Sequence, residues 1–330
     1  MVAKRLVALI AAVALVIGAV AFRRSLDHGS NDSSAPNASN PSDPGTPSAT
    51  TSAKSTVITC LTDLADVCHT AATTLGNVTV DVRSYRETLD AARAGSPPAI
   101  WVTVAPLDRL AVDSRSTKLY PDAPVVLASS PIALVTFADR ADILATACQG
   151  TITWKCVGEH AGSLWSSIGG QPAWQKVTVG HANPRSSAFG MLTLGAAAVG
   201  YFNGNAFIKA DIENDPGFPG WFSQLEGPIL TTLYGLRSPL DGMTLRKIVN
   251  VVGTPEVDLQ SAGTQLPLLS ASYPEPAVRI DAEVAVLAGA TVPAALVSEL
   301  TAALIAAGWK AAGVPNGLPS AEALLTLANL

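Results

Sequence analysis

The chain has few charged residues, few cysteines and few histidines. Charged residues fill 14% of its 330 positions, whereas an average globular protein has about 25%. Its 21 Lys and Arg and 26 Asp and Glu give a net charge of −5. This balance argues against a nucleic-acid partner, because nucleic-acid-binding proteins usually present a basic face. The 4 cysteines and 4 histidines are too few and too scattered for a multi-zinc protein.

The sequence motifs of common enzymes are also missing. It has no HExxH motif, and no GxSxG, P-loop or GxGxxG motif occurs in a suitable context. No nucleophile stands in a recognisable pattern with a general base. We therefore predict a protein that is not an enzyme, with no cofactor, no metal and no catalytic residue.

The N-terminal segment predicts export. An unbroken apolar run of seventeen residues, 6–22, follows Lys4 and Arg5, and its length is at the lower limit for crossing a bilayer. Residues 1–24 are therefore either a retained single-pass anchor or a signal peptide, with Ala19-Val20-Ala21 as the cleavage pattern. In the first case the folded part lies outside the cell membrane, and in the second it is secreted or held in the cell envelope.

Residues 25–55 are rich in Ser, Asn, Asp, Pro and Thr and contain almost no large apolar side chain. Such a composition cannot bury enough surface to offset its ordering entropy. We predict a disordered linker here, followed by a folded part over residues 56–330.

The cysteines repeat one spacing. Cys60 and Cys68 are eight residues apart, and so are Cys148 and Cys156. An even number of cysteines in an exported chain indicates disulfides, while four unpaired buried thiols fit that compartment less well. Eight residues of straight helix rise about 12 Å, too far for a bridge. Each predicted pair therefore needs a non-helical segment between its members, for which Thr62-Asp63 and Gln149-Gly150-Thr151 are the candidates.

Strands and helices alternate along the folded part. The pattern predicts strands over residues 56–59, 78–82 and 99–104, with helices over 61–75 and 88–94 between them. This order implies a parallel sheet with crossover helices, and therefore the α/β class. Further along, we expect strands or apolar runs at 124–128, 131–137, 177–179, 251–252 and 278–287, and helices over 139–148, 154–164, 188–202, 220–236, 240–249, 293–306 and 320–328.

Four stretches in this order resemble the type II periplasmic-binding-protein fold. They are Ser84-Tyr85-Arg86-Glu87-Thr88-Leu89 with residues 99–102, the run 127–135 around Ser129-Ser130, the loop and helix start at 180–190, and Val251-Val252-Gly253-Thr254-Pro255-Glu256. Within that fold, the chain is similar to molybdate-binding-like proteins and to actinobacterial extracellular solute-binding domains.

The resemblance implies two lobes, each a mostly parallel sheet flanked by helices, joined by two crossover hinge segments. The first lobe is expected to comprise residues 56–137 and 278–330, and the second residues 138–277. A small anion or polar solute would bind between them. The expected partners are that solute, with an oxyanion as one candidate class, and the permease of an ABC-type transporter.

The candidate ligand-binding residues are polar groups at loops and crossings: Ser84, Tyr85, Ser129, Ser130, Asn183, Arg185, Ser186, Ser187 and Thr254. Ser186 and Ser187 precede the predicted helix 188–202, whose free N–H groups suit an oxyanion. A serine in this place fits an N-cap equally well. We expect Ser84 and Tyr85 of one lobe to face Asn183, Ser186 and Ser187 of the other.

The sequence thus predicts an extracytoplasmic solute-binding protein, membrane-tethered or secreted. The alternative is a cell-envelope interaction or scaffold protein that uses the same fold with its cleft lost or filled.

Overall fold

The computed structural model describes residues 55–112, 116–121, 123–204, 209–227, 238–244, 248–313 and 318–330. The predicted anchor or signal peptide, residues 1–24, and residues 25–54 of the predicted linker lie outside this part of the chain. Within it, no helix is both long enough and apolar enough to cross a membrane. The elements described below belong to one compact unit, Ala53–Leu330.

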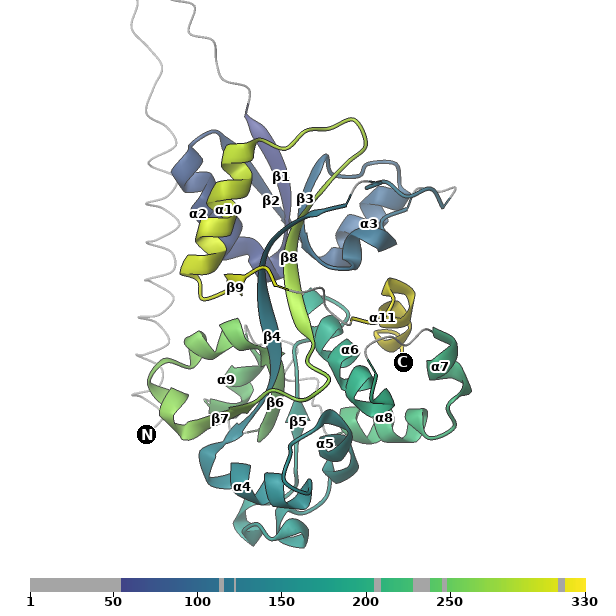
Figure 1. Cartoon of the computed structure of the whole chain (residues 1–330), viewed down its shortest axis with the longest axis vertical. Coiled ribbons are helices and arrows are strands. Elements are labelled where there is room, and N and C mark those ends of the chain that lie inside the picture. The colour runs from purple at the N-terminus through teal and green to yellow at the C-terminus, as the bar shows by residue number, and fades with distance from the viewer. Residues whose placement is uncertain are drawn as a thin grey trace, which may run out of the picture. The chain divides into compact units, whose positions relative to one another are not determined.

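The first lobe is built on three parallel strands, as the alternating pattern predicts. β1 (Thr56–Leu61) lies between β2 (Val78–Arg83) and β3 (Ile100–Val104). β8 (Arg279–Val286) extends this sheet by pairing antiparallel with β3. Helices α2 (Ala65–Leu75) and α10 (Ala294–Ala306) lie side by side on one side of the sheet, and α3 (Tyr85–Arg93) lies on the other (Figure 1).

One long strand connects the two lobes. β4 (Val125–Phe137) combines the two apolar runs that the sequence indicates on either side of Ser129-Ser130. Its residues 125–131 pair with β8, and its residues 132–137 pair with the second-lobe strands β6 (Val251–Pro255) and β7 (Leu269–Ser272). Figure 1 shows β4 and β8 running from one lobe toward the other. This strand is the first of the crossings that the resemblance implies.

The second lobe is built around residues 132–137 of β4. β5 (Val179–Gly180) pairs parallel with β6, but β6 and β7 pair antiparallel with β4, so the sheet of this lobe is mixed and not mostly parallel as expected. Its helices are α4 (Ala138–Ala147), α5 (Trp154–His160), α6 (Ala188–Phe202), α8 (Phe218–Glu226) and α9 (Pro239–Thr244). The first twelve residues of α6 are all buried, which is typical of a helix that is apolar on every side. The predicted helix 220–236 is seen as α8 in its described part, up to Glu226. The predicted helix 240–249 is seen as α9 only as far as Thr244, because residues 248 and 249 are not helical.

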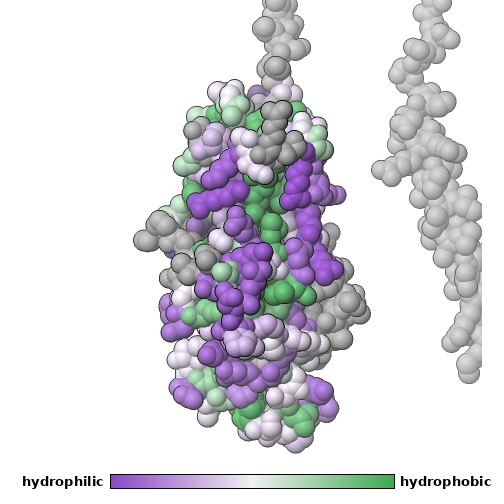
Figure 2. Space-filling view, turned by 90° about the vertical axis from the view of Figure 1, so that its right-hand side faces the viewer, coloured by the Kyte–Doolittle hydropathy of each residue, from purple (hydrophilic) through white to green (hydrophobic). Residues whose placement is uncertain are grey.

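Shorter elements complete the chain. They are the 3₁₀ segments η1 (Thr62–Leu64), η2 (Leu107–Leu110), η3 (Trp165–Ile168), η4 (Pro172–Trp174) and η6 (Glu256–Leu268), the helices α7 (Lys209–Asn214) and α11 (Ala321–Leu327), and the strand β9 (Lys310–Ala311). α11 packs against α6 of the second lobe and against η2 of the first. On the side that faces right in Figure 1, hydrophobic residues form short stretches between hydrophilic ones (Figure 2).

Both predicted disulfides are present, and each lies within one lobe. Cys60–Cys68 has a Cα–Cα distance of 6.5 Å, and it joins β1 to α2 across the short 3₁₀ segment η1. Cys148–Cys156 has a Cα–Cα distance of 5.6 Å. Here Gln149 and Gly150 turn the chain with φ angles of 57° and 100°. The turn at Gln149 and Gly150 is therefore where the sequence places it, whereas Thr62 and Asp63 lie in the 3₁₀ segment η1, and the first bridge forms because Cys60 is in a strand.

Candidate functional site

The two loops expected to face each other do meet between the lobes. Tyr85, in the first turn of α3, donates its hydroxyl to the carbonyl oxygen of Pro184 at 2.7 Å. Pro184 belongs to the polar loop 181–187 that leads into α6. The tyrosine side chain is fully buried, so this hydrogen bond lies inside the contact between the lobes.

A carboxylate of the first lobe binds the N-terminus of α6. Asp63, in η1, accepts a 2.5 Å hydrogen bond from the Ser187 hydroxyl on Oδ1 and a 2.9 Å bond from the Ala188 N–H on Oδ2. Ser187 in turn caps α6 by accepting from the Gly190 N–H at 3.0 Å. The N-cap and the anion site, the two alternatives for Ser187, are thus combined in one residue. The anion is the protein's own side chain.

Burial raises the pKa of Asp63, and hydrogen bonds from Ser187 and Ala188 oppose this only in part. Desolvation therefore destabilises the ionised carboxylate more than the hydrogen bonds from its donors stabilise it. A helix N-terminus carries partial positive charge, which favours an anion at this place. Sequence reasoning missed Asp63 and treated the Thr62-Asp63 pair only as a break in a helix. A carboxylate followed by a disulfide-bonded helix gives no local signal of a partner so far along the chain.

The loop 181–187 before α6 is held in place by contacts of His181 and by close packing at Gly190. The buried His181 ring contacts Glu226 Oε1 and the Ala182 carbonyl oxygen, each at 2.7 Å. Burial lowers the pKa of His181, but the Glu226 carboxylate and the hydrogen bonds outweigh it, so the pKa lies above its usual value. A side chain at Gly190 would overlap the Ala182 carbonyl oxygen, so the loop packs against α6 only because this position is glycine.

The other predicted residues of these loops have local roles or face solvent. Ser84 forms a capping box with Glu87, which makes α3 begin at Tyr85 instead of residue 88. Asn183 accepts a 2.9 Å hydrogen bond from the Arg185 N–H and shapes the turn. The side chains of Arg185 and Ser186 are exposed. Of the expected cradle, Tyr85 and Ser187 contribute side-chain hydrogen bonds that cross between the lobes.

The three predicted hydroxyls at the crossings are buried and hydrogen-bonded. Ser129 donates to Asp281 at 2.5 Å, Ser130 accepts from the Val257 N–H at 3.1 Å, and Thr254 donates to Asp258 at 2.6 Å.

Asp258 is a second carboxylate that sequence reasoning missed. Burial raises its pKa to about 6; the hydrogen bond from Thr254 lowers it, and the negative charge of Asp63 raises it further. Two acids with raised pKa values thus influence each other near the lobe contact, and such perturbed groups cluster at functional sites. Among the described residues, no group of three or more His, Cys, Asp or Glu could hold a metal ion.

Solved structures of periplasmic binding proteins are similar to this chain. A periplasmic thiamin binding protein is 12% identical, with a TM-score of 0.51 over 83% of this chain and 92% of that one. AfuA from Actinobacillus pleuropneumoniae, bound to fructose-6-phosphate, is 13% identical (TM-score 0.47, covering 76% and 79%). The sulfate-binding protein SubI from Mycobacterium tuberculosis H37Rv is 13% identical (0.45, 78% and 86%). No family model and no curated protein matches the sequence. The fold is the two-lobed type II periplasmic-binding-protein fold.

Proposed function

We propose that this chain is a non-catalytic, extracytoplasmic solute-binding protein that takes a small anionic solute between its lobes. The observation that carries the proposal is the position of Asp63, whose carboxylate joins the first lobe to the N-terminus of α6 in the second. The donors around it, a hydroxyl and a helix N–H, are those that an anionic ligand would use.

The solute's acid group would take the place of the Asp63 carboxylate. When the lobes part, Asp63 moves away with the first lobe, and Ser187 and the Ala188 N–H become free to bind an anion. Closure then traps the solute. The contact through Asp63 stabilises the closed form without solute, so a solute must compete with it. The N-terminal segment would tether or export the folded part, and an ABC-type permease would receive the solute.

The alternative function is that of an envelope interaction or scaffold protein. It is favoured by the several polar contacts that join the two lobes. Besides Asp63 and Tyr85, Lys310 of β9 forms a 2.5 Å ion pair with Glu256, the residue after β6. In this reading, the Asp63 carboxylate permanently fills the place of a ligand.

The two functions are separated by emptying the anion position in the full-length chain. Asp63→Ala leaves the Ser187 hydroxyl and the Ala188 N–H without their acceptor. We expect acetate, sulfate, phosphate or molybdate to raise the melting temperature of this variant more than that of the wild type. A ligand at 100 times its dissociation constant stabilises by about 2.7 kcal/mol.

Asp66→Ala is the matched control, because Asp66 is an exposed acid three residues further along the chain. It should respond to the anions like the wild type. If no anion shifts the melting temperature of any of the three proteins, the solute-binding proposal fails and the scaffold function remains.

A further inference from the structure

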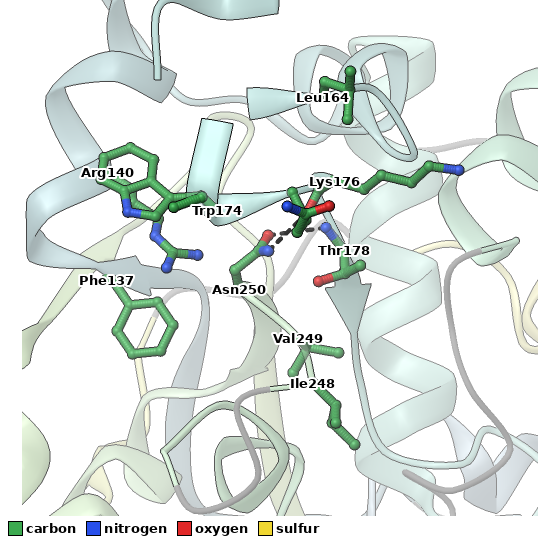
Figure 3. A pocket seen from close by; sticks show the side chains of 11 residues that line it. Phe137, Arg140, Leu164, Trp174, Lys176, Thr178, Ile248, Val249 and Asn250 are labelled. Carbon is green, nitrogen blue, oxygen red and sulfur yellow. Dashed lines mark hydrogen bonds between the residues drawn. The ribbon is translucent and has the colours of Figure 1, made fainter. Parts of the chain in front are cut away.

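A pocket of about 520 Å³ lies in the second lobe, away from the contact between the lobes (Figure 3). It lies where β4 ends at Phe137 and where β6 is about to begin at Val251. The opposite end of β6, at Pro255, is the end near Asp258 and the crossings. The pocket is therefore separated from the proposed solute site by the length of a strand. Its volume is in the usual range for small-molecule sites.

Arg140 forms one wall of this pocket. Its guanidinium carbon lies 4.7 Å from the ring centre of Phe137, 4.8 Å from that of Trp174 and 5.7 Å from that of Trp165. The side chain is only 16% exposed. The nearest carboxylate oxygen in the described structure is Asp139 Oδ1, 3.7 Å from Nε, which is too far for a hydrogen bond. The Nε atom is buried and has no hydrogen-bond partner among the described residues.

A second buried polar atom without a partner lines the same pocket. It is the hydroxyl oxygen of Thr178, and Figure 3 shows Thr178 and Val249 across the pocket from Arg140 and Phe137. Asn250, between them, accepts from the Thr178 N–H and donates to the Lys176 carbonyl oxygen, each at 2.9 Å. Buried polar groups are normally hydrogen-bonded, so two exceptions among the residues of one pocket point to a missing partner.

The rest of the lining defines what that partner is. Leu164, Ile248 and Val249 add apolar surface to that of the aromatic rings, and Lys176 also lines the pocket, with its side chain running away from Arg140 (Figure 3). No acidic side chain lines the pocket. Burial lowers the pKa of Arg140, and the charge of Asp139 offsets this only in part. An inorganic anion would leave the apolar walls uncovered, and a neutral apolar molecule would leave the Nε atom of Arg140 without a hydrogen-bond partner.

We propose that this pocket binds a small organic monocarboxylate with an apolar body. The carboxylate accepts hydrogen bonds from Arg140 and Thr178, and the body packs against the apolar wall that Ile248 and Val249 form. This site is independent of the proposed solute site between the lobes.

The test is titration of the full-length chain with octanoate, followed by calorimetry and by the fluorescence of the tryptophans at Arg140. We expect saturable binding, with octanamide bound at least about tenfold more weakly because it lacks the charge. Thr178→Val, which keeps the shape of the side chain, should weaken octanoate about five- to tenfold and leave the fold intact. Arg140→Met should weaken it at least as much.

Lys155→Met is the control variant, because Lys155 stacks on the ring of Tyr201 at 5.3 Å and does not line the pocket. It should bind octanoate like the wild type. The proposal is overturned if octanoate does not bind, if octanamide binds equally well, or if folded Thr178→Val and Arg140→Met proteins both keep wild-type affinity. If octanoate binds at the Asp63 position instead, neither Thr178→Val nor Arg140→Met will weaken its binding, and the proposal is overturned.

Discussion

Asp63 and Ser187 are 124 residues apart in the sequence and share a 2.5 Å hydrogen bond between Oδ1 and Oγ. The acid follows the first strand of one lobe, and the serine caps the central helix of the other. In a two-lobed binding protein, a ligand shifts the population toward the closed form by binding it more tightly. If this chain works as proposed above, the Asp63 contact stabilises the closed form without a solute, and a solute would have to compete with that contact.

The first prediction concerns Tyr85, whose hydrogen bond to Pro184 crosses the same contact. Tyr85→Phe should lower the free energy of unfolding by about 0.5–1.5 kcal/mol, because a neutral hydrogen bond is lost. After Asp63→Ala has loosened the contact, the same change should cost less. We expect a coupling of about 0.5–1 kcal/mol in a double-mutant cycle, measured by urea unfolding. Small-angle scattering should show a larger radius of gyration for the double variant.

Tyr120→Phe is the matched control. Tyr120 is also buried and donates to a proline carbonyl oxygen, that of Pro98, at 2.9 Å, but both residues belong to the first lobe. Its loss should cost a similar free energy and show no coupling to Asp63→Ala. Equal coupling for both tyrosines would show that the effect of Asp63 is general and not a property of the lobe contact.

Much of the fold is predictable because its signals are local. The alternation in residues 78–82 and the apolar pattern of residues 188–202 give β2 and α6 close to their observed bounds. The sequence also contains a signal for the start of α3. Ser84 and Glu87 have the spacing of a capping box, which places the start of the helix three residues earlier than the apolar pattern does. By contrast, β7 is only four residues long and follows an irregular 3₁₀ segment, so no periodicity marks it.

The site is predictable only in part, for a physical reason. A polar loop before an apolar helix identifies Ser187, because capping is local chemistry. Its partner Asp63 comes from the other lobe, and nothing in the residues around Asp63 indicates that it contacts a serine 124 residues further along the chain. The same holds for the pocket at Arg140, whose walls come from segments between residues 137 and 250. Such sites depend on tertiary contacts that no short pattern records.

The second prediction concerns the disulfides. Each closes a short loop, since its cysteines are eight residues apart, and chain-entropy arguments give about 2.5 kcal/mol for a loop of this size. Replacing both Cys148 and Cys156 by serine should lower the melting temperature in calorimetry. The response of the Asp63→Ala protein to anions should persist in this background, because the bridge lies within one lobe. Loss of the response would connect this bridge to the lobe contact.

The third prediction is a pH dependence that Asp258 adds to stability. Its pKa is about 6 in the folded protein, against an ordinary value of 3.8. Between these values the folded state binds more protons than the unfolded state, so this contribution is complete below about pH 4 and is lost as the pH rises through 6. Asp258→Asn removes the titration and keeps an acceptor for Thr254. The variant should be more stable than the wild type at pH 7.5, by about 1–3 kcal/mol, and similar to it at pH 4.

Thermal unfolding of both proteins between pH 4 and 8 measures this difference, with the exposed Asp66→Asn as a control that should leave the profile unchanged. A further step connects the prediction to the lobe contact. Because the negative charge of Asp63 helps to raise the pKa of Asp258, Asp63→Ala should move the stability change of Asp258 to lower pH. A stability gain of Asp258→Asn that is the same at pH 4 and pH 7.5 would mean that the substitution acts through packing, and that the two acids do not interact across the lobes.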